Sequence, residues 1–121
     1  MKRLVSRFAV ALVGSALMAL AACKSPHVEV TVVNNTGSEV RLLEVDYPSA
    51  SFGFDSIAAG ASKHYKIQVQ DSGNVKVQYN GVGDKQFQSS GPELKQGFQG
   101  TLLITLEPGG KAEFVKAGTG G

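Results

Sequence analysis

The chain has 121 residues, with 12 Lys and Arg against 10 Asp and Glu, and a single cysteine. A chain of this length suits one domain with one hydrophobic core. One cysteine excludes an internal disulfide, and a formal net charge of +2 is too small to favour binding to nucleic acid.

The first 22 residues differ in pattern from the rest of the chain. Three of the twelve cations lie in MKRLVSR, and FAVALVGSALMALAA follows without a charge. A basic segment, an apolar segment and small residues at its end are the parts of a secretory signal peptide. A transmembrane helix needs about 20 apolar residues, and this run is shorter and rich in Ala, Gly and Ser. We therefore expect residues 1–22 to be a helical signal peptide that is cleaved.

Cys23 follows this signal peptide directly, at the end of Leu20-Ala21-Ala22-Cys23. An aliphatic residue, two small residues and a cysteine resemble the lipobox of bacterial lipoproteins. The resemblance implies that a diacylglycerol group is attached to the Cys23 thiol, that the chain is cleaved before Cys23, and that its new amino terminus is usually acylated, as with palmitate. Two or three acyl chains, at about 0.8 kcal/mol per buried methylene, hold a protein firmly on a membrane. The alternative is an ordinary signal peptide followed by an incidental cysteine.

Lys24, the residue after the cysteine, bears on which membrane would hold the lipid-anchored protein. Asp at this place retains enterobacterial lipoproteins in the inner membrane, so Lys24 resembles an outer-membrane address. We expect a protein anchored by lipid to the cell membrane or the outer membrane, with its domain facing the periplasm or the outside. Residues 23–27 would be the lipidated cysteine and a short tether.

Residues 28–116 alternate between apolar and polar side chains, which is typical of half-buried β-strands. In residues 27–33 (HVEVTVV) the alternate valines share one face, and residues 34–37 (NNTG) form a turn. In residues 39–47 (EVRLLEVDY), Leu42 is expected on the inner face, and a bulge near Leu43 would restore the alternation.

The later strands are predicted from the same alternation. Residues 62–70 and 75–79 are expected to pair as a hairpin, with Tyr65 facing inward. Residues 89–100 (SSGPELKQGFQG) read as a loop, and residues 117–121 as a disordered tail. Further strands are expected at 51–57, 85–88, 101–107 and 111–116.

Seven or eight short strands, without helical periodicity after residue 23, predict an all-β fold. We expect an antiparallel two-sheet sandwich that is immunoglobulin-like in architecture. A small barrel or a cupredoxin-like Greek key would have a similar strand pattern. The cysteine pair and core tryptophan of antibody domains are absent from the sequence, so only the architecture is predicted.

Metal and nucleophile chemistry find little support in the sequence. A blue-copper site needs two histidines, a cysteine and usually a methionine, but Cys23 is assigned to lipid, and Met1 and Met18 lie in the signal peptide. His27 and His64 have no neighbouring group at zinc-ligand spacing, and His64 is expected to be a solvated surface residue. We expect no metal, no cofactor and no enzyme activity.

Aromatic residues give the candidate binding site. Tyr47, Phe52 and Phe54 lie close together in DYPSASFGF, and loop aromatics can stack on sugars or fill a partner's pocket. Alternatively, Phe52 and Phe54 are two residues apart, share one face and fill the core. Phe98, in a glycine-rich segment, is expected either to act in binding or to plug one end of the sandwich.

The expected function is that of a lipid-anchored, non-catalytic envelope protein that binds another envelope protein or has a structural role. The first alternative is a carbohydrate- or lipid-binding module that uses Tyr47, Phe52 and Phe54. The second is a small envelope enzyme, which would need His64 within hydrogen-bond reach of an acid and a hydroxyl.

Overall fold

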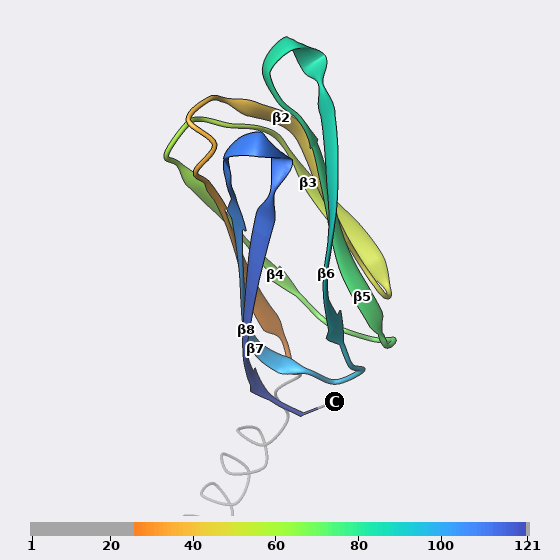
Figure 1. The fold of residues 1–121 in the computed structure, drawn as a ribbon. Helices are drawn as coiled ribbons and strands as arrows, with labels where there is room; N and C mark the ends of the chain where they lie inside the picture. The colour runs from red at the N-terminus through yellow and green to blue at the C-terminus, as the bar shows by residue number, and fades with distance from the viewer. Residues whose placement is uncertain (1–25, 121) are drawn as a thin grey trace, which may run out of the picture.

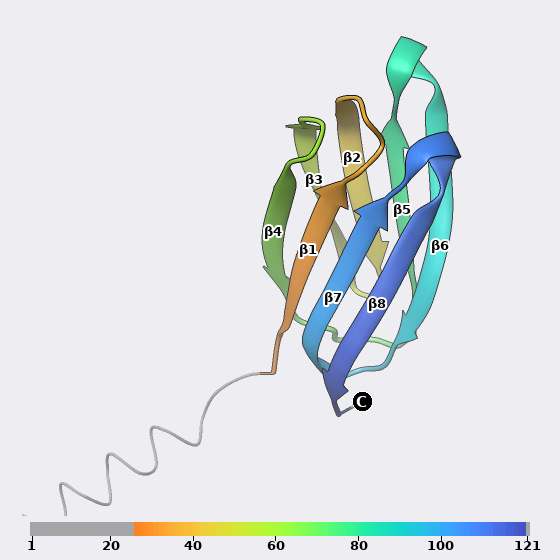
Figure 2. The same cartoon turned by 60° about the vertical axis from the view of Figure 1, so that its left-hand side comes forward.

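The structure is a computed structural model, and it describes residues 26–120. In these residues, eight β-strands form two four-stranded sheets that pack face to face (Figures 1 and 2). One sheet has the strand order β4-β1-β7-β8 and the other β3-β2-β5-β6. The predicted two-sheet, immunoglobulin-like sandwich is therefore confirmed. The strands are β1 Val28–Asn34, β2 Val40–Tyr47, β3 Ala50–Ile57, β4 Ser62–Ile67, β5 Gly73–Asn80, β6 Gln86–Leu94, β7 Gln99–Leu106 and β8 Ala112–Thr119, with short 3-10 turns η1 Val82–Asp84 and η2 Pro108–Gly110.

The core lies between the two sheets and is built from alternate apolar side chains. In β1, the valines at 28, 30 and 32 are at most 1% exposed, and in β5, Val75 and Val77 are fully buried. A strand's side chains point alternately to its two faces, so every second residue reaches the same core. The inner faces predicted for these two strands are confirmed. Leu94 and Phe98 are also buried, so Phe98 is part of the core.

The predicted bulge in β2 exists, but its register differs. The pairing of β2 with β5 shifts between Arg41 and Glu44. Leu42 has a φ of 51° and is 62% exposed, whereas Leu43 is buried. The prediction that Leu42 faces the core is wrong, because the bulge inserts Leu42 as an extra outward residue. A left-handed backbone costs a residue with a side chain about 1–2 kcal/mol.

The predicted hairpin between residues 62–70 and 75–79 is wrong. β4 pairs with β1, whereas β5 pairs with β2 and β6 in the other sheet. The segment between them crosses from one sheet to the other, and the Ser49 hydroxyl accepts a hydrogen bond from the Gln70 N–H at 3.2 Å. Apolar alternation identifies the inner face of a strand but not its partner.

The predicted loop at 89–100 is mostly strand, because β6 continues to Leu94 and β7 begins at Gln99. β6 lies at a sheet edge, where Pro92 removes a donor that an edge strand need not use. A Cβ at Gly91 would lie 2.6 Å from the Phe114 ring. Gly91 and Pro92 are therefore features of an edge strand that packs closely against β8.

The predicted disordered tail is also corrected, since β8 continues to Thr119. Gly118 lies opposite Gly100 in the pairing of β8 with β7. A Cβ at Gly100 would lie 2.1 Å from the Ala117 carbonyl oxygen, and one at Gly118 would lie 2.2 Å from that of Gln99. The glycines near the end of the chain allow this close approach of two strands.

The two ends of the sandwich differ. β1 begins at the end where β7 begins and β8 finishes, which we call the base end (Figure 2). The opposite end, which we call the loop end, carries four connections: the β1–β2 loop (35–39), the β3–β4 loop (58–61), the β5–β6 turn (81–85) and the β7–β8 turn (107–111).

Candidate functional site

The predicted aromatic residues lie where the edge strands β3 and β4 close one side of the sandwich. The Phe52 ring stacks on the Tyr65 ring, with centroids 4.5 Å apart. Phe54 and Tyr47 lie beside Phe52 at centroid distances of 5.8 and 6.2 Å. We call Tyr47, Phe52, Phe54 and Tyr65 the aromatic seam. Because β3 and β4 belong to different sheets, the seam joins the two sheets at this side.

The aromatic seam does not form an exposed platform. Phe52 is 8% exposed, and Phe54 and Tyr47 are half-buried against the core. Partial burial is the larger cause that raises the pKa of Tyr47, and the neighbouring Tyr65 is the smaller one. Tyr65, predicted to face inward, is 47% exposed and covers Phe52. Phe52 and Phe54 thus lie as expected if they fill the core.

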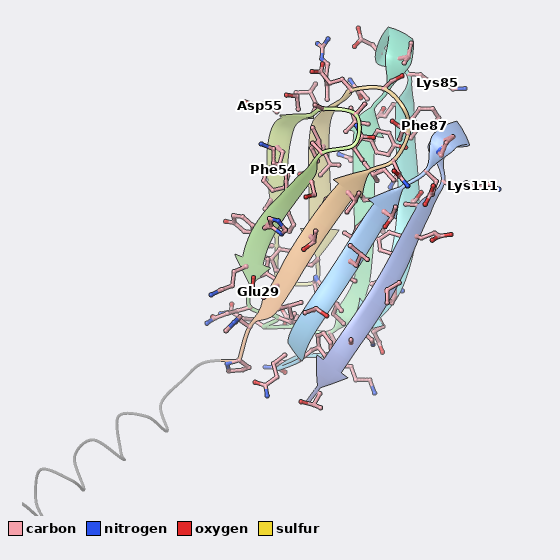
Figure 3. All side chains as sticks on the ribbon, turned by 90° about the vertical axis from the view of Figure 1, so that its left-hand side faces the viewer. Glu29, Phe54, Asp55, Lys85, Phe87 and Lys111 are labelled. Atoms are coloured by element: carbon pink, nitrogen blue, oxygen red, sulfur yellow. The ribbon has the colours of Figure 1, made fainter. Side chains whose placement is uncertain are left out.

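A pocket of about 270 Å³ opens at the loop end. Its walls come from the segments 36–40, 79–87 and 107–110, so that strands β2, β5 and β6 contribute to it together with the β1–β2 loop, the β5–β6 turn and the β7–β8 turn. Figure 3 shows Lys85, Phe87 and Lys111 gathered at this end of the sandwich, well away from Glu29. We call this cavity the loop-end pocket.

Phe87 fixes one wall of the loop-end pocket. Its ring lies 5.4 Å from the Tyr79 ring and packs between Gly81 and Gly110. A Cβ would lie 2.9 Å from the Phe87 ring at Gly81 and 2.3 Å from it at Gly110. Gly110 also has a φ of 82°, so both its backbone and its contact with the ring require glycine. The Lys85 ammonium lies 5.4 Å from the centre of the Phe87 ring, in cation–π contact.

Asn34 holds the β1–β2 loop in place. Its side chain is fully buried, and Nδ2 donates to the carbonyl oxygens of Ser38 (2.7 Å) and Ile57 (2.9 Å). Oδ1 accepts from the Thr36 backbone N–H (3.1 Å) and hydroxyl (2.7 Å). All four hydrogen-bonding positions of the amide are used. Because Thr36 and Ser38 line the loop-end pocket, Asn34 also fixes that wall.

Tyr79 lines the loop-end pocket from β5 and is 2% exposed. Its hydroxyl is buried and has no hydrogen-bond partner among the described residues. Burial raises the pKa of Tyr79, so the hydroxyl stays protonated at neutral pH. A buried polar group without a partner costs about 1–3 kcal/mol.

The remaining predicted residues do not assemble into a second site. His64 is exposed, and its Nδ1 lies 3.0 Å from the Thr31 hydroxyl. Within residues 26–120, no carboxylate makes a hydrogen bond or ion pair with His64, and no cluster of three or more His, Cys, Asp or Glu could bind a metal. Over the same range, no helix has the length and hydropathy to cross a membrane. The signal peptide and Cys23 lie outside the described residues.

Sequence reasoning missed the loop-end pocket, because its lining residues are spread over three distant segments. The available signal was the pair of glycine-rich turns, NGVGDK before Phe87 and EPGGK after β7. Both contain glycines with positive φ, at 83, 109 and 110. Their convergence on one ring depends on which strands pair.

Comparison with known proteins reveals a fold but no family. No family model matches the chain, and no curated protein matches it. Among solved structures, the chain is similar to the NMR structure of a protein from Eubacterium rectale, with a TM-score of 0.55 and 11% identity. The match covers 77% of this chain and 90% of that chain. At this identity, the similarity shows a shared fold alone.

Proposed function

We propose that the protein is a lipid-anchored, non-catalytic binding module of the bacterial cell envelope that presents its loop end to a partner protein. The observation that supports this proposal is the position of the loop-end pocket relative to β1. Val28 begins β1 at the base end, five positions after Cys23. The turns that line the pocket lie at the other end of the sandwich, as the ribbon in Figure 2 shows.

The length of β1 and the span of residues 24–27 indicate which end of the sandwich a lipid anchor would hold near the membrane. A strand of seven residues, such as β1, rises about 23 Å. The four residues 24–27 between Cys23 and β1 span at most about 14 Å when extended. A lipid on Cys23 would therefore keep the base end close to the bilayer and direct the loop-end pocket away from it.

The two alternative functions have weaker support. A carbohydrate- or lipid-binding module would use Tyr47, Phe52 and Phe54, but Phe52 is buried beneath Tyr65. A small envelope enzyme would need an acid beside His64, and the hydrogen bond of His64 in the described residues is with Thr31.

The anchor is tested with the substitution Cys23→Ser. We expect this variant to lose labelling by a fatty-acid analogue and to leave the membrane fraction, because a hydroxyl does not replace the thiol as the lipid acceptor. If Cys23→Ser is still processed and stays in the membrane fraction to the same extent, the anchor proposal is wrong.

The binding surface is tested with two exposed valines. Val82 lines the loop-end pocket and is 74% exposed, whereas Val115 on β8 is 58% exposed and does not line it. We expect Val82→Lys to abolish co-purification of the partner from detergent-extracted envelopes, and Val115→Lys to retain it. Loss with Val115→Lys alone would move the binding surface to the outer face of β7 and β8.

A further inference from the structure

The loop-end pocket is small and has apolar walls. Its volume of about 270 Å³ lies below the range of about 300–1,000 Å³ typical of sites for drug-sized ligands, so it suits one large side chain. Val40, Val82 and Pro108 line it together with the rings of Tyr79 and Phe87. Such walls can cover the methylene stem of a long side chain.

The polar side chains that remain unused in the pocket are mainly acceptors. Glu39 and Glu107 line it, and neither carboxylate forms an ion pair in the part of the chain that the structure describes. An ionised carboxylate only accepts hydrogen bonds. Lys85 is the lining cation, and its ammonium lies over the Phe87 ring.

Three backbone donors of the two turns are already engaged. The Gly81 N–H donates to the Lys85 carbonyl oxygen at 2.8 Å, and the Asp84 N–H donates to that of Gly81 at 3.1 Å. The Glu107 N–H donates to the Lys111 carbonyl oxygen at 2.8 Å. These three N–H groups are therefore not offered to a ligand, and the Glu39 and Glu107 carboxylates only accept hydrogen bonds. A ligand that binds the two carboxylates would have to supply the donors itself.

We propose that the loop-end pocket binds an arginine or lysine side chain of the partner protein. The alkyl stem would pack on Val40, Val82 and Pro108, and the cationic head would donate to the carboxylates of Glu39 and Glu107. A guanidinium offers five N–H donors and an ammonium three, and arginine is common among the residues that dominate binding energy. This inference rests on the proposed function, because the partner supplies the side chain.

The test measures the binding of capped amino acids to the full chain purified in detergent. N-acetyl-arginine methylamide is the probe, and N-acetyl-norleucine methylamide is its neutral counterpart with a similar stem. We expect the arginine probe to bind with a Kd on the order of 1 mM, at least tenfold tighter than norleucine. The amide NMR shifts of the β5–β6 and β7–β8 turns should change on binding. Free arginine is a third ligand, and binding tighter than the capped probe would assign the pocket to a small amine and overturn the proposal.

Variants separate charge recognition from a general loss of structure. The double variant Glu39→Gln, Glu107→Gln keeps the size of both side chains and should remove the preference for arginine. Glu93→Gln changes an exposed carboxylate on β6 near the base end and should leave the preference unchanged. Equal binding of the two capped probes to the native chain, or an arginine preference that survives in the double variant, would overturn the proposal.

The outcomes also separate this inference from the proposed function. If Val82→Lys abolishes partner binding and the arginine preference is absent, the loop end is the binding surface and the ligand class is wrong. If the arginine preference is present and Val82→Lys retains the partner, the ligand class stands for the pocket and the proposed function is wrong.

Discussion

The aromatic seam and the loop-end pocket both contain clustered aromatic rings, but the rings do different things. In the seam, Phe52 is packed under Tyr65 and has neighbours on several sides. In the pocket, the Phe87 ring packs between two glycines and borders a cavity. The seam rings pack on one another where two edge strands meet, whereas the Phe87 ring forms a wall of the pocket. The comparison separates a structural cluster from a candidate site.

The largest expected effect is a loss of stability when the aromatic seam is altered. Phe52→Ala should lower the free energy of unfolding by about 3–5 kcal/mol, because it removes a buried ring that joins the two sheets. Urea denaturation measures this loss. The arginine probe should bind the folded variant as it binds the native chain. A loss of binding without a loss of stability would contradict the division between seam and pocket.

The next largest effect concerns Asn34, whose hydrogen bonds hold the β1–β2 loop in place at the loop-end pocket. Asn34→Ala should lower the free energy of unfolding by about 3 kcal/mol, since it leaves the Ser38 and Ile57 carbonyl oxygens without their donor. It should also weaken binding of the arginine probe, because Thr36 loses its acceptor. Asn35→Ala is the matched control: Asn35 is exposed, and its change should be within about 0.5 kcal/mol. Equal effects of the two substitutions would contradict the role assigned to Asn34.

Two neighbouring glycines isolate the contact with Phe87. Gly109 and Gly110 have φ values of 81° and 82°, so alanine strains the backbone equally at both. A Cβ at Gly109 meets no atom within 4 Å, whereas one at Gly110 meets the Phe87 ring at 2.3 Å. Gly110→Ala should therefore destabilise the fold by about 2 kcal/mol more than Gly109→Ala. Equal melting temperatures of the two variants would show that Phe87 does not depend on Gly110.

The smallest effect concerns the unpartnered hydroxyl. Tyr79→Phe should leave the free energy of unfolding at pH 7 unchanged or raise it by up to about 1 kcal/mol, because the ring stays and an unsatisfied group is removed. The pKa of Tyr79 is raised above its ordinary value of 10.0, so above that pH the unfolded chain loses a proton that the folded chain keeps. Stability is therefore complete below pH 10 and falls as the pH rises toward the folded pKa. Tyr79→Phe should reduce this alkaline loss in denaturation measured across pH, and an identical pH profile would contradict the burial of the hydroxyl.

The fold could be predicted from the sequence wherever a strand has one buried face. The valines of β1 and the apolar residues of β5 alternate without interruption, and both strands lie as expected. Leu42 and Leu43 are equally apolar, so composition could not tell which of them the bulge would expose. Gly91 and Pro92 resemble loop residues. Their place in β6 depends on the edge position of that strand and on the contact of Gly91 with the Phe114 ring of β8.

The candidate site could be predicted only in part. Clustering in the sequence drew attention to Tyr47, Phe52 and Phe54, but large apolar rings close together in the chain pack against one another. The loop-end pocket depends on strand pairing, which brings Tyr79 and Phe87 together with Gly110 from a distant turn.

The most direct test compares the pocket with the seam in living cells. A photocrosslinking amino acid is placed at Val82, which lines the loop-end pocket, and separately at Tyr65, the most exposed residue of the aromatic seam. We predict a discrete protein adduct from position 82, which is lost in the Glu39→Gln, Glu107→Gln background, and no adduct from position 65. An adduct to protein, lipid or glycan from position 65, with none from position 82, would contradict the assignment of binding to the loop end.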